Sequence, residues 1–318
     1  MPGHFLAMDP PAHTRLRRLV AAEFSAGRID ARRPQITDAV GELVRQFAAG
    51  PRPADLVAAV AVPLPAMTAS EMLGTPLGDR EFFMTCARDL QVHDATVAQR
   101  VAAAGRMTRY LEGLISRKRR DPGDDVLSRL AAELDRDPSL SLAELVGVVN
   151  LVIVAGLETT AGLVSLATLS LLTDPAQFAL VRSNPVRWAR PAVVEALRFW
   201  TVVQHGVARV ATRDVTVAGR LIHAGDAVIV SLASANRDPA VYPEADRFDI
   251  TRDARQQIAF GHGVHRCLGS FVAEVQAELT ITELVSRLPG LRLDEAPDRL
   301  TFLDDMLVYG LRELPVDW

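Results

Sequence analysis

The chain has 318 residues, of which 49% are hydrophobic and 23% charged, and its formal net charge is −4. This length and apolar content allow one large domain or two ordinary ones with a substantial core. The slightly acidic balance gives no reason to expect nucleic acid as a partner. The two cysteines, Cys86 and Cys267, lie far apart in the sequence. We therefore expect no disulfide framework, and a reducing cytoplasm suits the chain better.

The first part of the chain is predicted to be helical. Residues 1–19 have no long apolar core and no small-residue cleavage site, so we expect no signal peptide. Apolar residues at helical spacing predict helices over Arg15–Phe24 (with Thr14 as N-cap), Arg33–Ala48, Asp55–Leu73, Asp79–Val92 and Val97–Arg120. Four basic residues, 117–120, end the last of these helices. They could bind an acidic partner, but cations at a helix C-terminus are also favoured by the macrodipole.

The most apolar run, Val146–Leu157, is interrupted by Asn150, and the helix around it carries Glu158 and Thr159 near its middle. This pattern favours a buried helix of a soluble protein over a membrane anchor. A carboxylate there is costly unless it is paired or hydrated. Thr159 can also hydrogen-bond to the carbonyl of Ala155, which bends a helix. We predict a bent helix with a buried acid and a hydroxyl beside a water-lined pocket; the alternative is a solvated polar stripe on a half-exposed helix.

The C-terminal part of the chain combines helices with short strands. The sequence EALR places Glu195 and Arg198 on one helix face, and apolar neighbours favour a buried pair over an ordinary surface salt bridge. Residues 207–232 are rich in valine and punctuated by glycines, which predicts short antiparallel strands with turns. Short strands and loops are also expected from Leu291 onward. The expected fold class is mainly α with small antiparallel β-sheets.

The stretch FGHGVHRCLG, residues 260–269, places Cys267 just before an amphipathic helix. That helix is expected to begin at or just after Cys267, where free N–H groups and the positive end of the dipole favour a thiolate. Three glycines flank the cysteine: Gly261, Gly263 and Gly269. They remove side chains, as a loop needs when a flat, bulky ligand must approach the sulfur. Phe260 could shield the sulfur from water, and His265 and Arg266 offer donors to an anionic group.

Three interpretations of Cys267 compete. The first is a buried structural cysteine in a turn. The second is an open zinc site completed by His262 and His265, which explains neither the glycines nor Phe260. The third is a thiolate-ligated haem, in which the thiolate pushes electron density onto the iron and favours O–O cleavage. Because the chain has no C-x-x-C-H motif, such a haem would not be covalently attached.

The same stretch resembles the haem loop of the cytochrome P450 superfamily, F-x-x-G-x-H-x-C-x-G, at the residues Phe260, Gly263, His265, Cys267 and Gly269. The resemblance runs along nearly the whole chain, from MDPPAHTRLRRL through SLASANRDPAVYPEADRF to GLRELPVDW, and is to the soluble bacterial type often found in actinomycete natural-product pathways. It implies one domain with the cytochrome P450 fold over residues 1–318. Family members carry several dozen residues ahead of MDPP. We therefore also expect the family's first helices, first sheet strands and pocket-roof loop to be missing.

The resemblance implies roles for particular residues. Cys267 would be the axial ligand of the iron in haem b, and Glu158 and Thr159 would form the acid–alcohol pair that manages protons during O2 activation. The haem would be contacted by His13, Arg17, Ala155, Gly156, Arg209, Phe260, Gly261, His265 and Gly269. Four of these donors would bind the haem propionates: His13, Arg17, Arg209 and His265. A structural triad would consist of Glu195, Arg198 and Arg247. The substrate pocket would be lined by Asn150, Val154, Val203, Gln204, Val207 and Met306.

The implied activity is that of a haem-thiolate monooxygenase, which inserts one oxygen atom from O2 into an apolar or amphiphilic small molecule. Electrons would come from a ferredoxin and its NAD(P)H-dependent reductase. The ferredoxin would dock on a basic surface formed by Arg15, Arg18, Arg28 and Arg266. Two other classes stay open: a haem-binding protein without turnover, and a zinc hydrolase that uses the cysteine loop.

Overall fold

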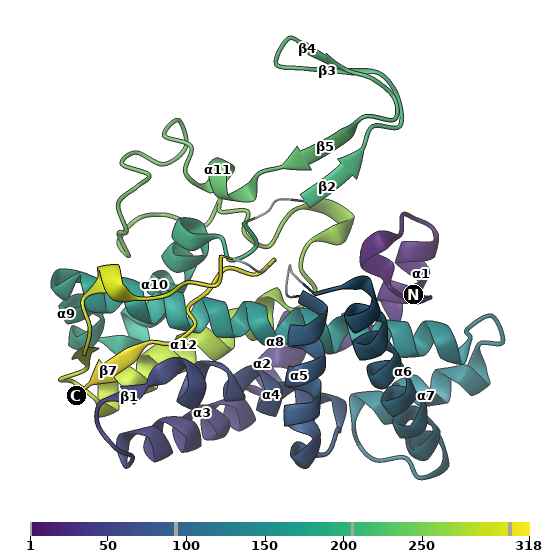
Figure 1. Ribbon diagram of the computed structural model, residues 1–318, viewed down its shortest axis with the longest axis horizontal. Coiled ribbons are helices and arrows are strands. Elements are labelled where there is room, and N and C mark those ends of the chain that lie inside the picture. Colours follow the sequence, from purple (N-terminus) through teal and green to yellow (C-terminus); the bar gives the residue numbers. More distant parts are fainter. Residues whose placement is uncertain (1, 92–94, 205–206, 305–306) are drawn as a thin grey trace.

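The computed structural model describes residues 2–91, 95–204, 207–304 and 307–318. Helices make up most of the molecule, and a thin strand ribbon projects from the helical body (Figure 1). The α-helices are α1 (Ala12–Ala21), α2 (Ala26–Ala31), α3 (Arg33–Ala48), α4 (Pro63–Leu73), α5 (Arg80–Gln91), α6 (Val97–Arg120), α7 (Val126–Arg136), α8 (Leu142–Thr173), α9 (Pro175–Ser183), α10 (Pro185–Trp200), α11 (Leu232–Asn236) and α12 (Ser270–Arg287). The strands are β1 (Ala54–Asp55), β2 (Val207–Val210), β3 (Val215–Val217), β4 (Arg220–Ile222), β5 (Ala227–Val230), β6 (Arg292–Leu293) and β7 (Pro315–Asp317).

Helix α8 crosses the middle of the molecule and organises the core (Figure 1). It begins at a capping box, in which Ser141 and Glu144 each accept a hydrogen bond from the other's backbone N–H. Most of its residues are buried, and it packs against α4, α5, α6, α10 and α12. Its length and composition would suit a membrane span, but 56% of its most apolar window is buried inside the protein. The prediction of a buried helix around Val146–Leu157 is confirmed.

The strands form three small antiparallel sheets. One sheet has the order β1-β7-β6, with Ala54 opposite Val316, and the other two are the ribbons β2-β5 and β3-β4. The β2-β5 ribbon leaves the helical body and ends in β3-β4 (Figure 1), so side chains such as Val210 and Ile229 are 65% and 68% exposed. The predicted fold class, mainly α with small antiparallel sheets, is confirmed.

Helix bounds predicted from periodicity hold where apolar spacing is regular. Both α3 and α6 have the predicted bounds, and α5 lies within the predicted range, whose last residue, Val92, is outside the described residues. The predicted N-cap of α1 is wrong. The helix begins at Ala12, and Pro11 occupies the N-cap position in place of Thr14. Proline needs no N–H partner at a helix start, so the helix can begin before the first side chain able to cap it.

The predicted start of the next helix at Asp55 is also wrong. Asp55 belongs to β1, and its carboxylate accepts the backbone N–H groups of Val57 and Ala58. A π-helical turn follows, and α4 begins only at Pro63. Because a proline has no N–H to donate, the regular α-helical ladder cannot continue through it.

Candidate active site

Cys267 lies at the end of a tight loop, three residues before α12 begins at Ser270. Its backbone N–H donates to the carbonyl of Phe260 at 2.8 Å, which folds the loop back on itself. Gly261 and Gly263 have φ angles of +69° and +76°. Side chains with a Cβ rarely adopt this left-handed region, so the fold of the loop requires glycine at both positions.

The environment of the Cys267 sulfur combines desolvation with positive charge. The residue as a whole counts as exposed, but protein atoms surround its thiol group. This burial raises the pKa of the thiol. The N–H of Gly269 hydrogen-bonds to the sulfur, and Arg17 and Arg266 are close enough for their charges to lower the same pKa. Nη2 of Arg17 also donates to the backbone carbonyl of Arg266 at 2.5 Å, which ties α1 to the loop. A donor and two cations favour the thiolate once a metal binds it.

Two histidines meet beside this loop. His13 on α1 is only 2% exposed, and its ring centroid lies 4.4 Å from that of His265. Burial lowers the pKa of His13, and the charges of His265 and Arg17 lower it further. Both ring nitrogens of His13 and Nδ1 of His265 lack a hydrogen-bond partner among the described residues. Since an unsatisfied buried polar group is costly, these atoms indicate that a polar ligand group belongs here.

The middle of α8 has an open face. Ala155 and Gly156 are exposed, although most of this helix is buried. Thr159 is one turn further along, and its hydroxyl donates to the carbonyl of Ala155 at 2.7 Å, which confirms the predicted hydrogen bond. Of the predicted pocket residues on this helix, Val154 is half-buried and Asn150 is buried. An exposed surface of small residues in a core helix is what a flat ligand needs in order to lie against the backbone.

Glu158 lies on the same helix, three residues after Ala155, and its side chain is buried. It is 6% exposed, and Oε1 has no hydrogen-bond partner among the described residues. Burial raises the pKa of the carboxyl, and the nearby charge of Arg88 opposes that shift. The alternative of a solvated polar stripe is therefore wrong for Glu158.

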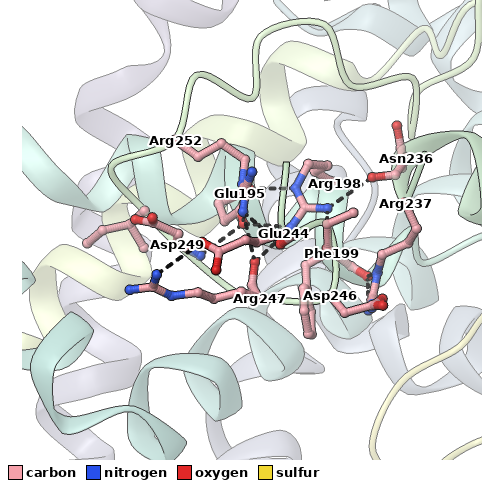
Figure 2. A network of polar contacts seen from close by, with 12 residues as sticks. Glu195, Arg198, Phe199, Asn236, Arg237, Glu244, Asp246, Arg247, Asp249 and Arg252 are labelled. Atoms are coloured by element: carbon pink, nitrogen blue, oxygen red, sulfur yellow. Dashed lines mark hydrogen bonds and ion pairs between the residues drawn. The ribbon is translucent and has the colours of Figure 1, made fainter. Parts of the chain in front are cut away.

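The predicted Glu195–Arg198 pair is present and fully buried, with both side chains 0% exposed. Nε and Nη2 of Arg198 donate to the two carboxylate oxygens of Glu195 at 2.7 Å each (Figure 2). The remaining N–H groups of Arg198 donate to the backbone carbonyls of Asn236, Ala245 and Arg247. One guanidinium therefore holds α10, α11 and the segment before the cysteine loop together.

The third cation of this network is Arg252, and the assignment of Arg247 from the sequence is wrong. Nε of Arg252 lies 3.4 Å from Oε1 of Glu195, and its other nitrogens donate to backbone carbonyls of residues 243, 244 and 247 (Figure 2). Arg247 contributes its carbonyl, while its side chain pairs with Glu244 at the surface. The backbone N–H of Arg247 donates to the carbonyl of Glu244 and closes a turn. After this turn the chain returns toward Glu195, which Arg252 then reaches.

Asn236 is a structural residue that sequence reasoning missed. It is 1% exposed and donates through Nδ2 to the hydroxyl of Thr201. Its Oδ1 accepts the N–H of Ile258, two residues before the loop that begins at Phe260. The one signal in the sequence was the Asn236 amide at the end of the segment SLASAN. If this segment is buried, the amide needs hydrogen-bond partners, which indicates a structural role.

The remaining predicted site residues are exposed, half-buried or outside the described residues. Arg209 on β2 is exposed and donates to the carbonyl of its neighbour Ala208 at 2.8 Å. In the described part of the chain it makes no contact with the other predicted propionate donors. Three predicted pocket residues are half-buried: Val203 and Gln204, which follow α10, and Val207, which begins β2. Met306 lies outside the described residues.

The zinc interpretation is contradicted by the geometry. Among the described residues, no three His, Cys, Asp or Glu side chains are close enough together to hold a metal ion. His262, His265 and Cys267 therefore do not form a zinc-ligand group.

Comparisons with known proteins agree with this site. The family model for cytochrome P450 matches residues 188–303. Cytochrome P450-SU2 from Streptomyces griseolus is 40% identical over 314 residues, which cover 99% of this chain and 77% of that protein. Pentalenic acid synthase from Streptomyces avermitilis is 39% identical over 313 residues, covering 98% of this chain and 77% of the relative. The crystal structure of CYP105P1 in complex with filipin I superposes with a TM-score of 0.95 at 38% identity, over 100% of this chain and 80% of that one.

The helical fold, the cysteine loop and these likenesses define a haem-dependent monooxygenase. The chain belongs to the cytochrome P450 family, whose members use haem b and O2. The residues present fit a haem: a cysteine beside two cations, buried histidine nitrogens without a partner, and an exposed small-residue face on α8.

Proposed function

We propose that Cys267 ligates the haem iron through its sulfur, and that Ala155, Gly156, Phe260, Gly261 and Gly269 contact the ring. His13, Arg17, Arg209 and His265 would donate to its propionates. The observation that carries this proposal is the position of Arg17. Its charge acts on both the Cys267 thiol and His13, whose ring nitrogens lack partners among the described residues. A cation and imidazole nitrogens without partners beside a cysteine suit an anionic ligand with a metal at its centre.

The bound haem would supply the activation of O2 and the insertion of one oxygen atom into the substrate. The role of the chain in that step would be to hold and move protons. Because burial raises the pKa of Glu158, its carboxyl retains a proton more readily than an exposed glutamate and can act as a general acid. The hydroxyl of Thr159 is fixed by the Ala155 carbonyl and would relay protons through water.

This proton role can be measured directly. Removing a general acid typically costs about 10²- to 10⁴-fold in rate, so Glu158→Gln should slow product formation by about 10²-fold or more while haem content stays the same. Thr159→Ala should raise NAD(P)H consumption relative to product. Unchanged turnover and coupling in both variants would refute the assignment.

The electron donor would be a ferredoxin reduced by an NAD(P)H-dependent reductase. Arg18 on α1, Arg28 on α2 and Arg266 in the cysteine loop are exposed, whereas Arg15 already pairs with Glu144. Exposed arginines steer an acidic partner, so charge reversal should lower the association rate, most strongly at low ionic strength.

Charge reversal at Arg18 and Arg28 should therefore slow ferredoxin-driven reduction, while Arg220→Glu on the distant β4 serves as the matched control. Equal reduction rates in all variants would overturn this placement.

The substrate would be an apolar or amphiphilic small molecule of secondary metabolism. Two of the matched proteins, pentalenic acid synthase and a P450 solved with filipin I, support this class by their names. Asn150, Val154, Val203, Gln204, Val207 and Met306 are the proposed pocket residues. The two cysteines are free, which suits a cytoplasmic location.

The first test is the absorption spectrum of the purified chain, reduced and exposed to carbon monoxide. A strongly red-shifted Soret band is expected, and it should disappear in Cys267→Ser but persist in Cys86→Ala, the matched control at the buried second cysteine. Haem absorption with no reductant consumption in the presence of any ligand would favour a haem protein without turnover. Absence of haem absorption would refute the proposed site.

A further inference from the structure

We propose that Asn236 is a positioning residue for Cys267. It fixes the peptide that enters the cysteine loop and thereby sets how the sulfur is hydrogen-bonded when it ligates the haem iron. This role rests on the proposed function and adds a residue to it. Its basis is a chain of hydrogen bonds that leads from the end of α10 through Asn236 to the loop that contains Cys267.

Asn236 is fixed by partners that lie outside the loop. It is the last residue of α11 and is only 1% exposed. Its Nδ2 donates to the hydroxyl of Thr201 at 2.8 Å, and its backbone carbonyl accepts from Nη1 of Arg198 at 2.9 Å (Figure 2). Both partners are fully buried. Because the amide nitrogen and the backbone are held in this way, Oδ1 is presented in one direction.

Thr201 provides a firm attachment at the end of α10. It is the C-cap of that helix and has a φ angle of +45°, in the left-handed region that a β-branched residue rarely adopts. Its hydroxyl lies 3.2 Å from the backbone carbonyl of Arg198. A backbone conformation of this kind persists only where the surrounding contacts enforce it, and such residues gather at functional sites. Asn236 is therefore attached to a closely determined point of the core.

On its other side, Asn236 reaches the entrance of the cysteine loop. Its Oδ1 accepts the backbone N–H of Ile258 at 2.9 Å. The carbonyl of Ile258 accepts the N–H of Gly261 at 2.8 Å, and the carbonyl of Phe260 accepts the N–H of Cys267 at 2.8 Å. The position of the Ile258 peptide therefore sets the position of the hydrogen bonds that close the loop around the sulfur.

The other hydrogen bonds of this entrance segment are local. The N–H of Gln257 donates to the carbonyl of Ala254, and the N–H of Ala259 donates to Oε1 of Gln257 at 2.7 Å. These bonds shape the turn but do not attach it to the core. Among the described residues, the contact with Asn236 is the hydrogen bond that joins residues 257–261 to a different helix. Without it, the entrance of the loop is free to shift.

A shifted loop changes the hydrogen bonding of the sulfur. In the structure, the N–H of Gly269 hydrogen-bonds to the sulfur of Cys267. Hydrogen bonds to a ligating thiolate draw electron density away from the metal and raise its reduction potential. Because a loosened loop weakens the bond from Gly269, loss of the Asn236 amide should lower the reduction potential of the haem iron.

The experiment is a spectroelectrochemical titration of two haem-loaded variants. Asn236→Leu removes both side-chain hydrogen bonds at nearly constant volume, whereas the matched control Thr201→Val removes only the bond on the side away from the loop. Both variants should lower Tm. In Asn236→Leu, the one-electron reduction equilibrium should shift by about tenfold, or about 59 mV, toward the oxidised state. In Thr201→Val, the equilibrium should change by less than about threefold.

Equal shifts in the two variants, or a lowered Tm without a shift in Asn236→Leu, would mean that Asn236 only stabilises the fold, and the proposal would be overturned. The carbon monoxide spectrum of the unsubstituted chain tests the proposed function separately. Absence of its red-shifted Soret band refutes the haem site. Presence of that band together with an unshifted potential in Asn236→Leu refutes only the role of Asn236.

A second variant and a second measurement cover the case in which Asn236→Leu does not retain haem. Asn236→Ser keeps a polar side chain that is too short to reach Ile258, so it should lower the potential in the same direction. Hydrogen exchange of the Ile258 amide in the unsubstituted, haem-loaded enzyme should be slow, because Oδ1 of Asn236 accepts its N–H. Exchange as fast as that of an exposed amide would overturn the proposal without any variant.

Discussion

Replacing Arg252 with glutamine should destabilise the fold by about 1–2 kcal/mol, whereas Arg247→Gln should cost less than about 0.5 kcal/mol. The two arginines are five residues apart in one loop and differ mainly in where their side chains point. The comparison therefore tests whether Arg252 is the third member of the buried network.

The magnitudes follow from burial and from the partners of each side chain. The Arg252 side chain is 11% exposed and bonds to the fully buried Glu195 and to three backbone carbonyls. Glu195 would keep its two bonds from Arg198 and one from the N–H of Asp249, which limits the loss. Arg247 and its partner are 60% and 72% exposed, and such surface pairs contribute little.

Arg198→Gln provides the upper reference. It removes one member of a fully buried ion pair and leaves the Glu195 carboxylate without its bidentate partner, which typically costs about 3–5 kcal/mol. The expected order of destabilisation is Arg198, then Arg252, then Arg247.

The assay is thermal unfolding of the haem-loaded enzyme, followed by far-ultraviolet circular dichroism. For a chain of 318 residues, an unfolding entropy of about 2.1 cal/mol/K per residue means that each kcal/mol lowers Tm by about 1.5 °C. Arg252→Gln should thus lower Tm by about 1.5–3 °C and Arg247→Gln by less than about 1 °C. A larger loss in Arg247→Gln than in Arg252→Gln would refute the network described here.

Three further changes test other parts of the structure. Burial raises the pKa of Glu158 above its ordinary value of 4.5, so above pH 4.5 the folded chain binds more protons than the unfolded chain and stability falls with rising pH until the folded pKa is passed. The gain in Tm from Glu158→Gln should therefore grow as pH rises from 4.5. A gain that does not depend on pH would contradict this. Gly162→Ala places a Cβ 2.8 Å from the carbonyl oxygen of Tyr309 and should cost about 1–3 kcal/mol by chemical denaturation, whereas the control Gly41→Ala, with no atom within 4 Å, should stabilise α3 by about 0.5–1 kcal/mol. Ser141→Ala removes the N-cap of α8, which typically costs about 1 kcal/mol, and should lower Tm by about 1.5 °C; an unchanged Tm would show that the cap contributes nothing.

Much of the fold was predictable because its signals are local. The apolar spacing in Arg33–Ala48 and Val97–Arg120 predicted helices with the bounds that the structure has. The hydrogen bond from the Thr159 hydroxyl to the Ala155 carbonyl depends only on residues four apart. The starts of α1 and α4 were missed because prolines and an aspartate compete for the same backbone groups at helix ends.

The site was predictable to the extent that it lies on one short stretch. Glycine positions, the cysteine and the histidines between Phe260 and Gly269 already specified a loop that a flat ligand can approach. The ring contact between His13 and His265 joins α1 to that loop across about 250 residues. No local spacing pattern in the sequence predicts such a contact.

By itself, the sequence determined the helices with regular apolar spacing, the short strands, the glycine-rich cysteine loop and the Glu195–Arg198 pair, because each depends on residues close together in the chain. Only the tertiary structure decided that Arg252 rather than Arg247 reaches Glu195, that Asn236 supports the loop, and that Oε1 of Glu158 is buried without a hydrogen-bond partner among the described residues. These outcomes depend on which distant backbone groups meet in the folded core. The free energy of burying a charge or an amide there is set by partners that the local sequence does not contain.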